Sequence, residues 1–140
     1  MNSQKFFTGG FVGGIVFFLL GWVFYGILLK DFMASNSVSM KADADMVWWA
    51  LIVGNLAMGF LLAYVIGKGS GATAASGATT GFVVGLLVAL SFDLVTYATS
   101  TAAPTLKAIA ADVAVFAVMS AIAGAVVGAV MATKRKTVTA

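Results

Sequence analysis

The chain has no cysteine, no histidine and no glutamate, and it has one proline among its 140 residues. Without cysteine it cannot form a disulfide, a thiolate metal site or a cysteine nucleophile. Without histidine and glutamate it lacks a histidine general base and a His/Glu metal centre. The remaining residues show no nucleophile–base pair and no phosphate-binding glycine loop after a strand. The sequence therefore predicts a protein without enzymatic activity, metal or cofactor.

Charged residues are also scarce. They make up 9% of the chain, whereas apolar residues make up 61% and the mean hydropathy is +1.06. A soluble domain is usually about 45–50% apolar and about 25% charged, so this chain has too few charges for a surface in water. We therefore predict an all-α membrane protein with a single domain over residues 1–140, whose first partner is the lipid bilayer. The basic residues form no patch interleaved with aromatics, so nucleic-acid binding is not expected.

Four long apolar stretches are present, and the first lies between Lys5 and Lys30 without a charge. A helix needs about 20 residues to cross the roughly 30 Å of hydrocarbon in a bilayer. The first stretch exceeds the roughly 7–15 apolar residues of a signal peptide and has no small-residue cleavage site, so we interpret it as a membrane helix. The predicted fold is a four-transmembrane-helix antiparallel bundle with spans at residues 6–29, 46–67, 77–98 and 105–132.

The connections between the spans are short and polar. Residues 31–45 are predicted to form a loop, with Asp45 as the N-cap of the second span. Residues 68–76 form a tight turn, and Pro104 suits the first turn of the last helix. Residues 133–140 form a basic tail.

Positive charges set the expected orientation. With four spans both termini lie on one side, and that side receives five basic residues and no acid. The other side receives three lysines and four aspartates. Because lysine and arginine near span ends mark the cytoplasmic face, both termini are predicted to be cytoplasmic.

Glycines recur at four-residue spacing within the spans, which leaves bare helix faces that another helix can approach closely. If the two halves of the chain are a duplication, the glycine strips of the first and third spans are expected to meet at a shared seam. Our first functional hypothesis is association with a second copy or a larger membrane-protein partner through these faces. The predicted helix-packing residues are Gly10, Gly14, Gly77, Gly81, Gly85, Gly124 and Gly128.

An internal repeat is a further possibility in this sequence. A shift of 71 residues places Gly10 and Gly14 on Gly81 and Gly85, and a shift of 67 places Asp45 on Asp112. Chance matches are common among apolar residues, so a duplication and a chance likeness both stay open. A true duplication would give two helical hairpins related by an axis along the membrane normal.

Asp93 is the only acid within a continuous apolar run. A carboxylate at the bilayer centre costs about 2.5–3.5 kcal/mol and less towards the interface, so Asp93 has either an interior role or an interfacial one. Our second hypothesis is a small-molecule binder or transporter with an outward-facing aromatic and aspartate pocket. The predicted ligand-binding residues are Asp93, Asn55, Trp22, Tyr25, Trp48 and Tyr97.

Each of these residues also has a structural interpretation. The tryptophans and Tyr97 suit an aromatic belt at the headgroups, and Asn55 suits a hydrogen bond between helices. Asp112 suits the start of a helix, or a rim pair with Lys107. Asp43 and Asp45 are too few to hold a divalent cation.

Residues 18–33, the Gly54–Asn55 pair and residues 90–97 together resemble a group of small bacterial four-span membrane proteins, catalogued as a domain of unknown function. The resemblance implies a bacterial inner-membrane location and the four-span topology, and it implies no activity. Small multidrug-resistance transporters share the size and span count. They use a glutamate in the first span, which this chain lacks. The motif shared with the uncharacterised four-span group lies at the end of the first span and consists of Gly21, Trp22, Tyr25 and Gly26.

Overall fold

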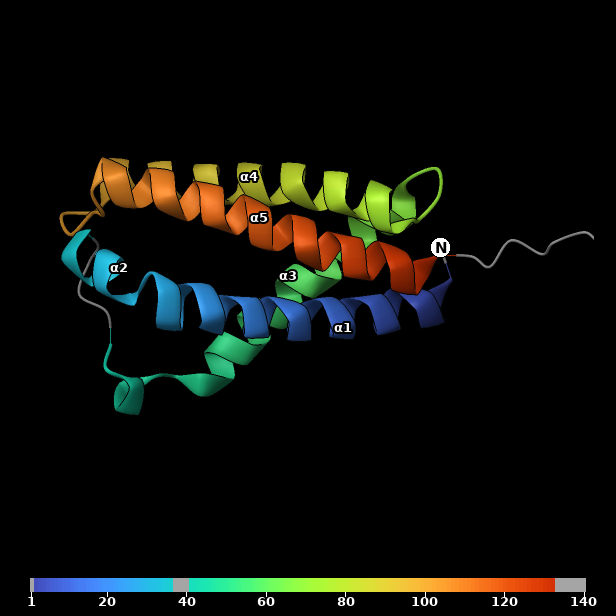
Figure 1. Cartoon of the computed structure of the whole chain (residues 1–140), viewed down its shortest axis with the longest axis horizontal. Helices are drawn as coiled ribbons and strands as arrows, with labels where there is room; N and C mark the ends of the chain where they lie inside the picture. Colours follow the sequence, from blue (N-terminus) through green and yellow to red (C-terminus); the bar gives the residue numbers. More distant parts are fainter. Residues whose placement is uncertain (1, 37–40, 133–140) are drawn as a thin grey trace, which may run out of the picture.

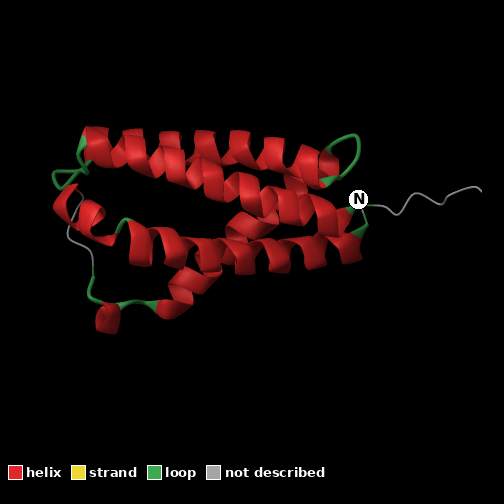
Figure 2. Cartoon of the chain, viewed as in Figure 1, coloured by secondary structure: helices red, strands yellow, loops and turns green. Residues whose placement is uncertain are grey.

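The computed structural model describes residues 2–36 and 41–132, and its regular structure there is helical throughout (Figure 2). Four segments are long and apolar enough to cross a membrane, as predicted: α1 with its continuation η1, then α3, α4 and α5. A 26-residue span such as α4 is about 39 Å long at roughly 1.5 Å per residue, more than the hydrocarbon core requires. The elements are α1 (Ser3–Gly21), η1 (Trp22–Leu28), α2 (Lys30–Asn36), η2 (Asp43–Asp45), α3 (Trp48–Lys68), α4 (Ala74–Thr99) and α5 (Leu106–Met131).

The prediction of a loop at residues 31–45 is wrong in part, because this stretch contains most of helix α2 and the short 3-10 helix η2. The first of these helices forms because Met33 is buried and α2 packs on η1 and α5. Residues 37–40 of the predicted loop and the tail at 133–140 lie outside the described residues.

Two predicted helix starts also differ from the structure. Asp45 lies within η2, and the residue that precedes α3 is Val47, so the prediction of an Asp45 cap is wrong. Pro104 lies one residue before the cap of α5, which is Thr105. The Thr105 hydroxyl accepts a hydrogen bond from the Ala108 amide at 3.2 Å and thereby satisfies one free donor of the first turn.

Helices α4 and α5 lie side by side and run in opposite directions (Figure 1). A Cβ on Gly77 would lie 3.0 Å from the Cα of Gly128, and a Cβ on Gly81 would lie 3.1 Å from the Cα of Gly124. Partner numbers fall along α5 as they rise along α4, which fixes the antiparallel register. The glycines are required here because a side chain would push the two backbones apart.

Helices α1 and α3 form the second close pair, and they cross at a larger tilt (Figure 1). Gly14 lies against the backbone of Leu56, and Gly59 lies against the backbone of Gly13 and Gly14. Gly10 lies under the Phe60 ring. The backbones therefore meet at small residues in this pair too.

The shared seam between the glycine strips of the first and third spans, expected if the chain is a duplication, is not formed. Each strip is used within its own pair, α1 with α3 and α4 with α5. The two pairs are joined instead by larger side chains in the core, where α1 and α3 meet α5. This core includes Phe17, Leu62, Met119, Ala123 and Val127.

One lysine near the N-terminus links the start of α1 to the end of α5. The Lys5 ammonium donates hydrogen bonds to the carbonyls of Met131 and Ala132 at 3.2 and 3.1 Å. These carbonyls have no partner within α5, and a cation at a helix C-terminus also favours the helix dipole. The contact fixes the first turn of α1 to the last turn of α5.

Candidate functional site

A hollow of about 520 Å³ opens at the end of the molecule where α4 ends and α5 begins. It lies between these two helices, the end of η1 and helix α2. We call it the aspartate hollow. Its lining is Tyr25, Met33, Phe92, Asp93, Thr96, Pro104, Ala108, Ile109, Asp112 and Phe116.

The register of α4 on α5 places its two carboxylates together. Gly85 packs on the Ser120 side chain, and these two residues lie four positions beyond Gly81 on α4 and four positions before Gly124 on α5. Eight positions further in the same directions lie Asp93 on α4 and Asp112 on α5. Each aspartate is six residues from the nearer end of its helix, a depth of about 9 Å at roughly 1.5 Å per residue.

Tyr25 reaches the hollow from η1, which is a π-helix. In a π-helix the amide of one residue bonds to the carbonyl five residues earlier, and single π turns are frequent at functional sites. The Leu29 amide closes such a turn on the Phe24 carbonyl at 2.7 Å. Within η1, Phe24 and Tyr25 are half-buried whereas Trp22 is 64% exposed, so the wide turn directs the tyrosine inward.

The polar side chains of Tyr25, Asp93 and Asp112 lie close together, but not all of their polar atoms form hydrogen bonds. Asp112 lies close to both Asp93 and Tyr25. The Tyr25 hydroxyl and the Oδ2 atom of Asp93 are nevertheless buried without an ordinary hydrogen-bond partner among the described residues. The described lining holds no lysine or arginine. Two acids and a hydroxyl therefore share this space with polar atoms to spare.

The structure brings together only two of the six predicted ligand-binding residues, Tyr25 and Asp93. Trp22, Trp48 and Tyr97 are 64%, 52% and 47% exposed and do not line the hollow. The Asn55 amide donates to the Leu51 carbonyl of its own helix at 2.7 Å, and this residue lies away from the hollow.

Asp112 is absent from the predicted ligand-binding residues, because its position in the sequence suits a helix start or a rim pair with Lys107. A signal for it was present, because Asp93 and Asp112 lie at nearly equal distances on either side of the connection between the last two spans. An antiparallel hairpin brings such positions to the same level. The α2 residue Met33 had no comparable signal, since its region was predicted to be a loop.

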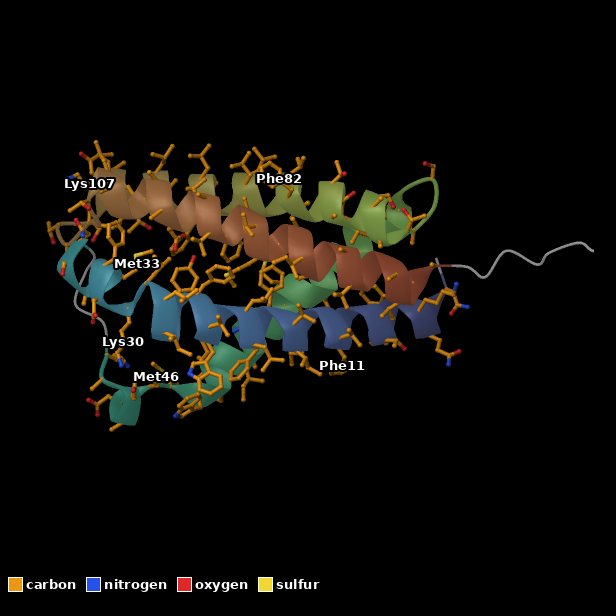
Figure 3. The ribbon with its side chains drawn as sticks, viewed as in Figure 1. Phe11, Lys30, Met33, Met46, Phe82 and Lys107 are labelled. Atoms are coloured by element: carbon orange, nitrogen blue, oxygen red, sulfur yellow. The ribbon has the colours of Figure 1, made fainter. Side chains whose placement is uncertain are left out.

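A second hollow, of about 570 Å³, follows the outer face of α4 and α5. Its lining is apolar, with residues such as Phe82, Leu90 and Val113. Figure 3 shows Phe82 and Phe11 pointing away from the bundle on opposite sides, as lipid-facing side chains do. This hollow offers no chemistry beyond contact with acyl chains.

Metal binding has little support within residues 2–36 and 41–132, where no group of three or more acidic, histidine or cysteine side chains comes together. The aspartate hollow is thus a two-carboxylate site with aromatic and apolar walls. No family model, curated protein or solved structure matches the chain, so the resemblance to the bacterial four-span group stays a prediction.

Proposed function

We propose that this chain is a multi-pass protein of the bacterial inner membrane that binds a small organic cation in the aspartate hollow. The cation belongs to the substituted-ammonium class, and the protein has cytoplasmic termini and no enzymatic activity. The observation that supports the proposal is the meeting of Asp93 and Asp112 in a space whose described lining carries no positive charge.

The charges favour a positive ligand. Two carboxylates on adjacent helices repel each other, and acids within membrane spans are retained where they pair with a partner, water or a proton. A charge left without a partner in a poorly solvated place destabilises the fold by several kcal/mol. A bound cation between Asp93 and Asp112 would offset that repulsion. It would also place a counter-charge beside the Asp93 oxygen that has no hydrogen-bond partner.

The walls favour an organic cation over a metal ion. Phe92, Phe116 and Tyr25 are among the lining residues, and a cation over an aromatic face gains about 0.5–2 kcal/mol. Met33 and Ile109 add apolar surface for alkyl groups. The volume of about 520 Å³ falls in the range of roughly 300–1,000 Å³ that is usual for small-molecule sites. Ca²⁺ by contrast takes about 6–8 oxygen ligands, more than this site supplies.

The test is a comparison of two probes of nearly equal shape. Choline carries a quaternary ammonium, and 3,3-dimethylbutan-1-ol replaces that nitrogen by carbon. Isothermal titration of the protein in detergent micelles should show binding of choline and not of the alcohol. Asp93→Asn and Asp112→Asn should each weaken choline binding at least about tenfold, which corresponds to about 1.4 kcal/mol.

Asp45→Asn is the matched control, because Asp45 is exposed in η2 and outside the hollow. It should leave the affinity for choline unchanged. Equal binding of choline and the alcohol, or full affinity in both asparagine variants of the hollow, would refute the proposal.

The hypothesis of association through glycine faces has less support. The seven predicted packing glycines are buried, and they lie against neighbouring helices of the same chain. A partner could reach them only if the bundle opened. Self-association stays a prediction, and native mass spectrometry in mild detergent would show it as a dimer or higher species.

A further inference from the structure

We propose that helix α2 is a lid over the aspartate hollow, hinged at η1 and latched to the start of α5 by Asn36 and Thr105. The lid controls access from water to Asp93 and Asp112. The identity of the ligand that the lid admits rests on the proposed function. The contacts of α2 support the lid independently of that ligand.

The cover is Met33. It is 4% exposed, it lines the hollow, and it is the one buried residue of the seven-residue helix α2. Figure 3 shows Met33 on the side of α2 towards α5, at the same end of the molecule as Lys30 and Lys107. Movement of α2 away from α5 would withdraw this side chain and widen the opening of the hollow at that end.

The hinge is the π-helical segment before α2. Phe24 and Tyr25 of η1 pack against the core, whereas its last three residues, 26–28, are exposed, so the end of η1 is the part that packing holds least. Leu29, between η1 and α2, has φ −108° and ψ 7°, outside the helical region, so the helix axis breaks there. A few residues at the end of an element that absorb a change in φ and ψ are the usual form of a hinge.

The latch is a pair of hydrogen bonds between the end of α2 and the cap of α5. The Thr105 amide donates to the Asn36 carbonyl at 2.9 Å, and the Thr105 hydroxyl lies 3.4 Å from the Asn36 Oδ1 atom. Thr105 is exposed and Asn36 is half-buried. Solvent-accessible bonds of this kind open at low free energy compared with those of a core helix.

The other polar link of α2 does not hold it to the bundle. The Lys30 ammonium lies 3.6 Å from the Asp43 carboxylate, and both side chains are more than half exposed. This ion pair joins α2 to η2, and an exposed pair contributes about 0–1 kcal/mol. Freeing α2 therefore requires release of the Asn36–Thr105 contact together with withdrawal of the buried Met33 side chain.

The test uses the absence of native cysteine. Asn36→Cys with Thr105→Cys places a thiol pair where a backbone hydrogen bond already holds the two Cα atoms close to the roughly 4.4–6.8 Å that a disulfide needs. The full-length protein in detergent is oxidised to lock the lid, and a second portion is kept reduced. Both are treated with a water-soluble carbodiimide and glycine ethyl ester, and mass spectrometry measures the amide formed at each aspartate.

We expect amide formation at Asp93 and Asp112 to be at least about tenfold slower in the oxidised form than in the reduced form. The exposed Asp45 of η2 is the internal control and should react at the same rate in both. Met33→Ala, with the latch intact, should speed the reaction at Asp93 and Asp112 relative to wild type.

Equal rates at Asp93 and Asp112 in the oxidised and reduced forms would overturn the lid. So would failure of the two cysteines to oxidise in the folded protein, because the latch would then not exist. Neither outcome touches the choline comparison, which measures binding. Loss of choline binding selectivity would conversely leave the access measurement intact, so the two proposals fail separately.

Discussion

Three buried polar atoms of the described residues have no hydrogen-bond partner, and they divide by position. The Tyr25 hydroxyl and one Asp93 oxygen face the aspartate hollow, whereas the Ser120 hydroxyl lies at the contact of Ser120 with Gly85. A buried polar group without a partner costs about 1–3 kcal/mol, so each needs a reason to be retained. The hollow gives Tyr25 and Asp93 such a reason, and it gives none to Ser120.

Tyr25→Phe and Ser120→Ala should therefore separate stability from binding. Each removes an unpaired hydroxyl, so neither should lower the free energy of unfolding, and each could raise it by about 1 kcal/mol. Only Tyr25→Phe should weaken choline binding, by about 2–10-fold, because it removes a polar group of the hollow. Unfolding in mixed micelles with increasing denaturing detergent and calorimetric titration would measure the two quantities.

A control for the stability arm is Ser76→Ala, which removes the hydrogen bond that the Ser76 hydroxyl accepts from the Thr73 amide and should cost about 0.5–1.5 kcal/mol. If Tyr25→Phe lost stability as Ser76→Ala does, the tyrosine hydroxyl would have a partner within the protein. The assignment of that hydroxyl to a ligand would then be wrong.

At the scale of the helices, the contact of α4 with α5 depends on the absence of side chains. A Cβ on Gly81 would collide with the Ser120 carbonyl, which belongs to a helix backbone and cannot rotate away. Gly81→Ala should separate the helices and lower the free energy of unfolding by about 1–3 kcal/mol, as overpacking does. It should also weaken choline binding, because the same register places Asp93 opposite Asp112.

Gly54→Ala is the matched control for that change, since nothing lies within 4 Å of a Cβ at Gly54 in α3. Alanine is favoured over glycine in a helix interior, so this variant should be neutral or more stable by about 0.5–1 kcal/mol. The same unfolding assay serves both variants. Equal losses for Gly81→Ala and Gly54→Ala would show that helix contact is not what the Gly81 position provides.

The four long helices could be predicted from the sequence to within a few residues, because an apolar run of about 20 residues or more is typical of a membrane-spanning helix. The glycine spacing likewise predicts close helix contact, but it does not say which helix is the partner. That choice depends on the packing of the whole bundle, which is why the seam was placed wrongly. Helix α2 and the π turn of η1 could not be predicted, because α2 depends on burying Met33 in a distant part of the chain.

For the site, the sequence predicts Asp93 because a lone acid in an apolar run is costly wherever it lies. It does not place Trp22 or Trp48, since helix ends rich in aromatics serve a headgroup belt as readily as a pocket. The pairing of Asp112 with Asp93 depends on the register of two helices, which the contacts of Gly77, Gly81 and Gly85 with α5 establish.

For the whole molecule, the two helix pairs share a way of packing without sharing a register. Gly10 lies under Phe60, and a shift of 67 carries Phe60 to Val127, yet Gly81 meets Gly124 and Ser120. The internal repeat therefore stays a prediction. The asymmetry has a consequence, because only the α4–α5 pair carries an aspartate on each helix, so the molecule has one such hollow among its described residues.

The orientation of the bundle decides which compartment that hollow faces. Lys5 and Lys68 lie at one end of the spans, and the aspartate hollow lies at the other. If positive charge marks the cytoplasmic side, the hollow opens near the outer surface, about 9 Å from the helix ends. Single cysteines at Ala42 and Ser100 should then react with an impermeant maleimide on intact cells, while cysteines at Ser3 and Ser70 should react only after lysis. Labelling of the cysteines at positions 3 and 100 from the same side of the membrane would contradict the four-span topology. A clean reversal of the pattern would keep the topology and turn the lid and the hollow towards the cytoplasm.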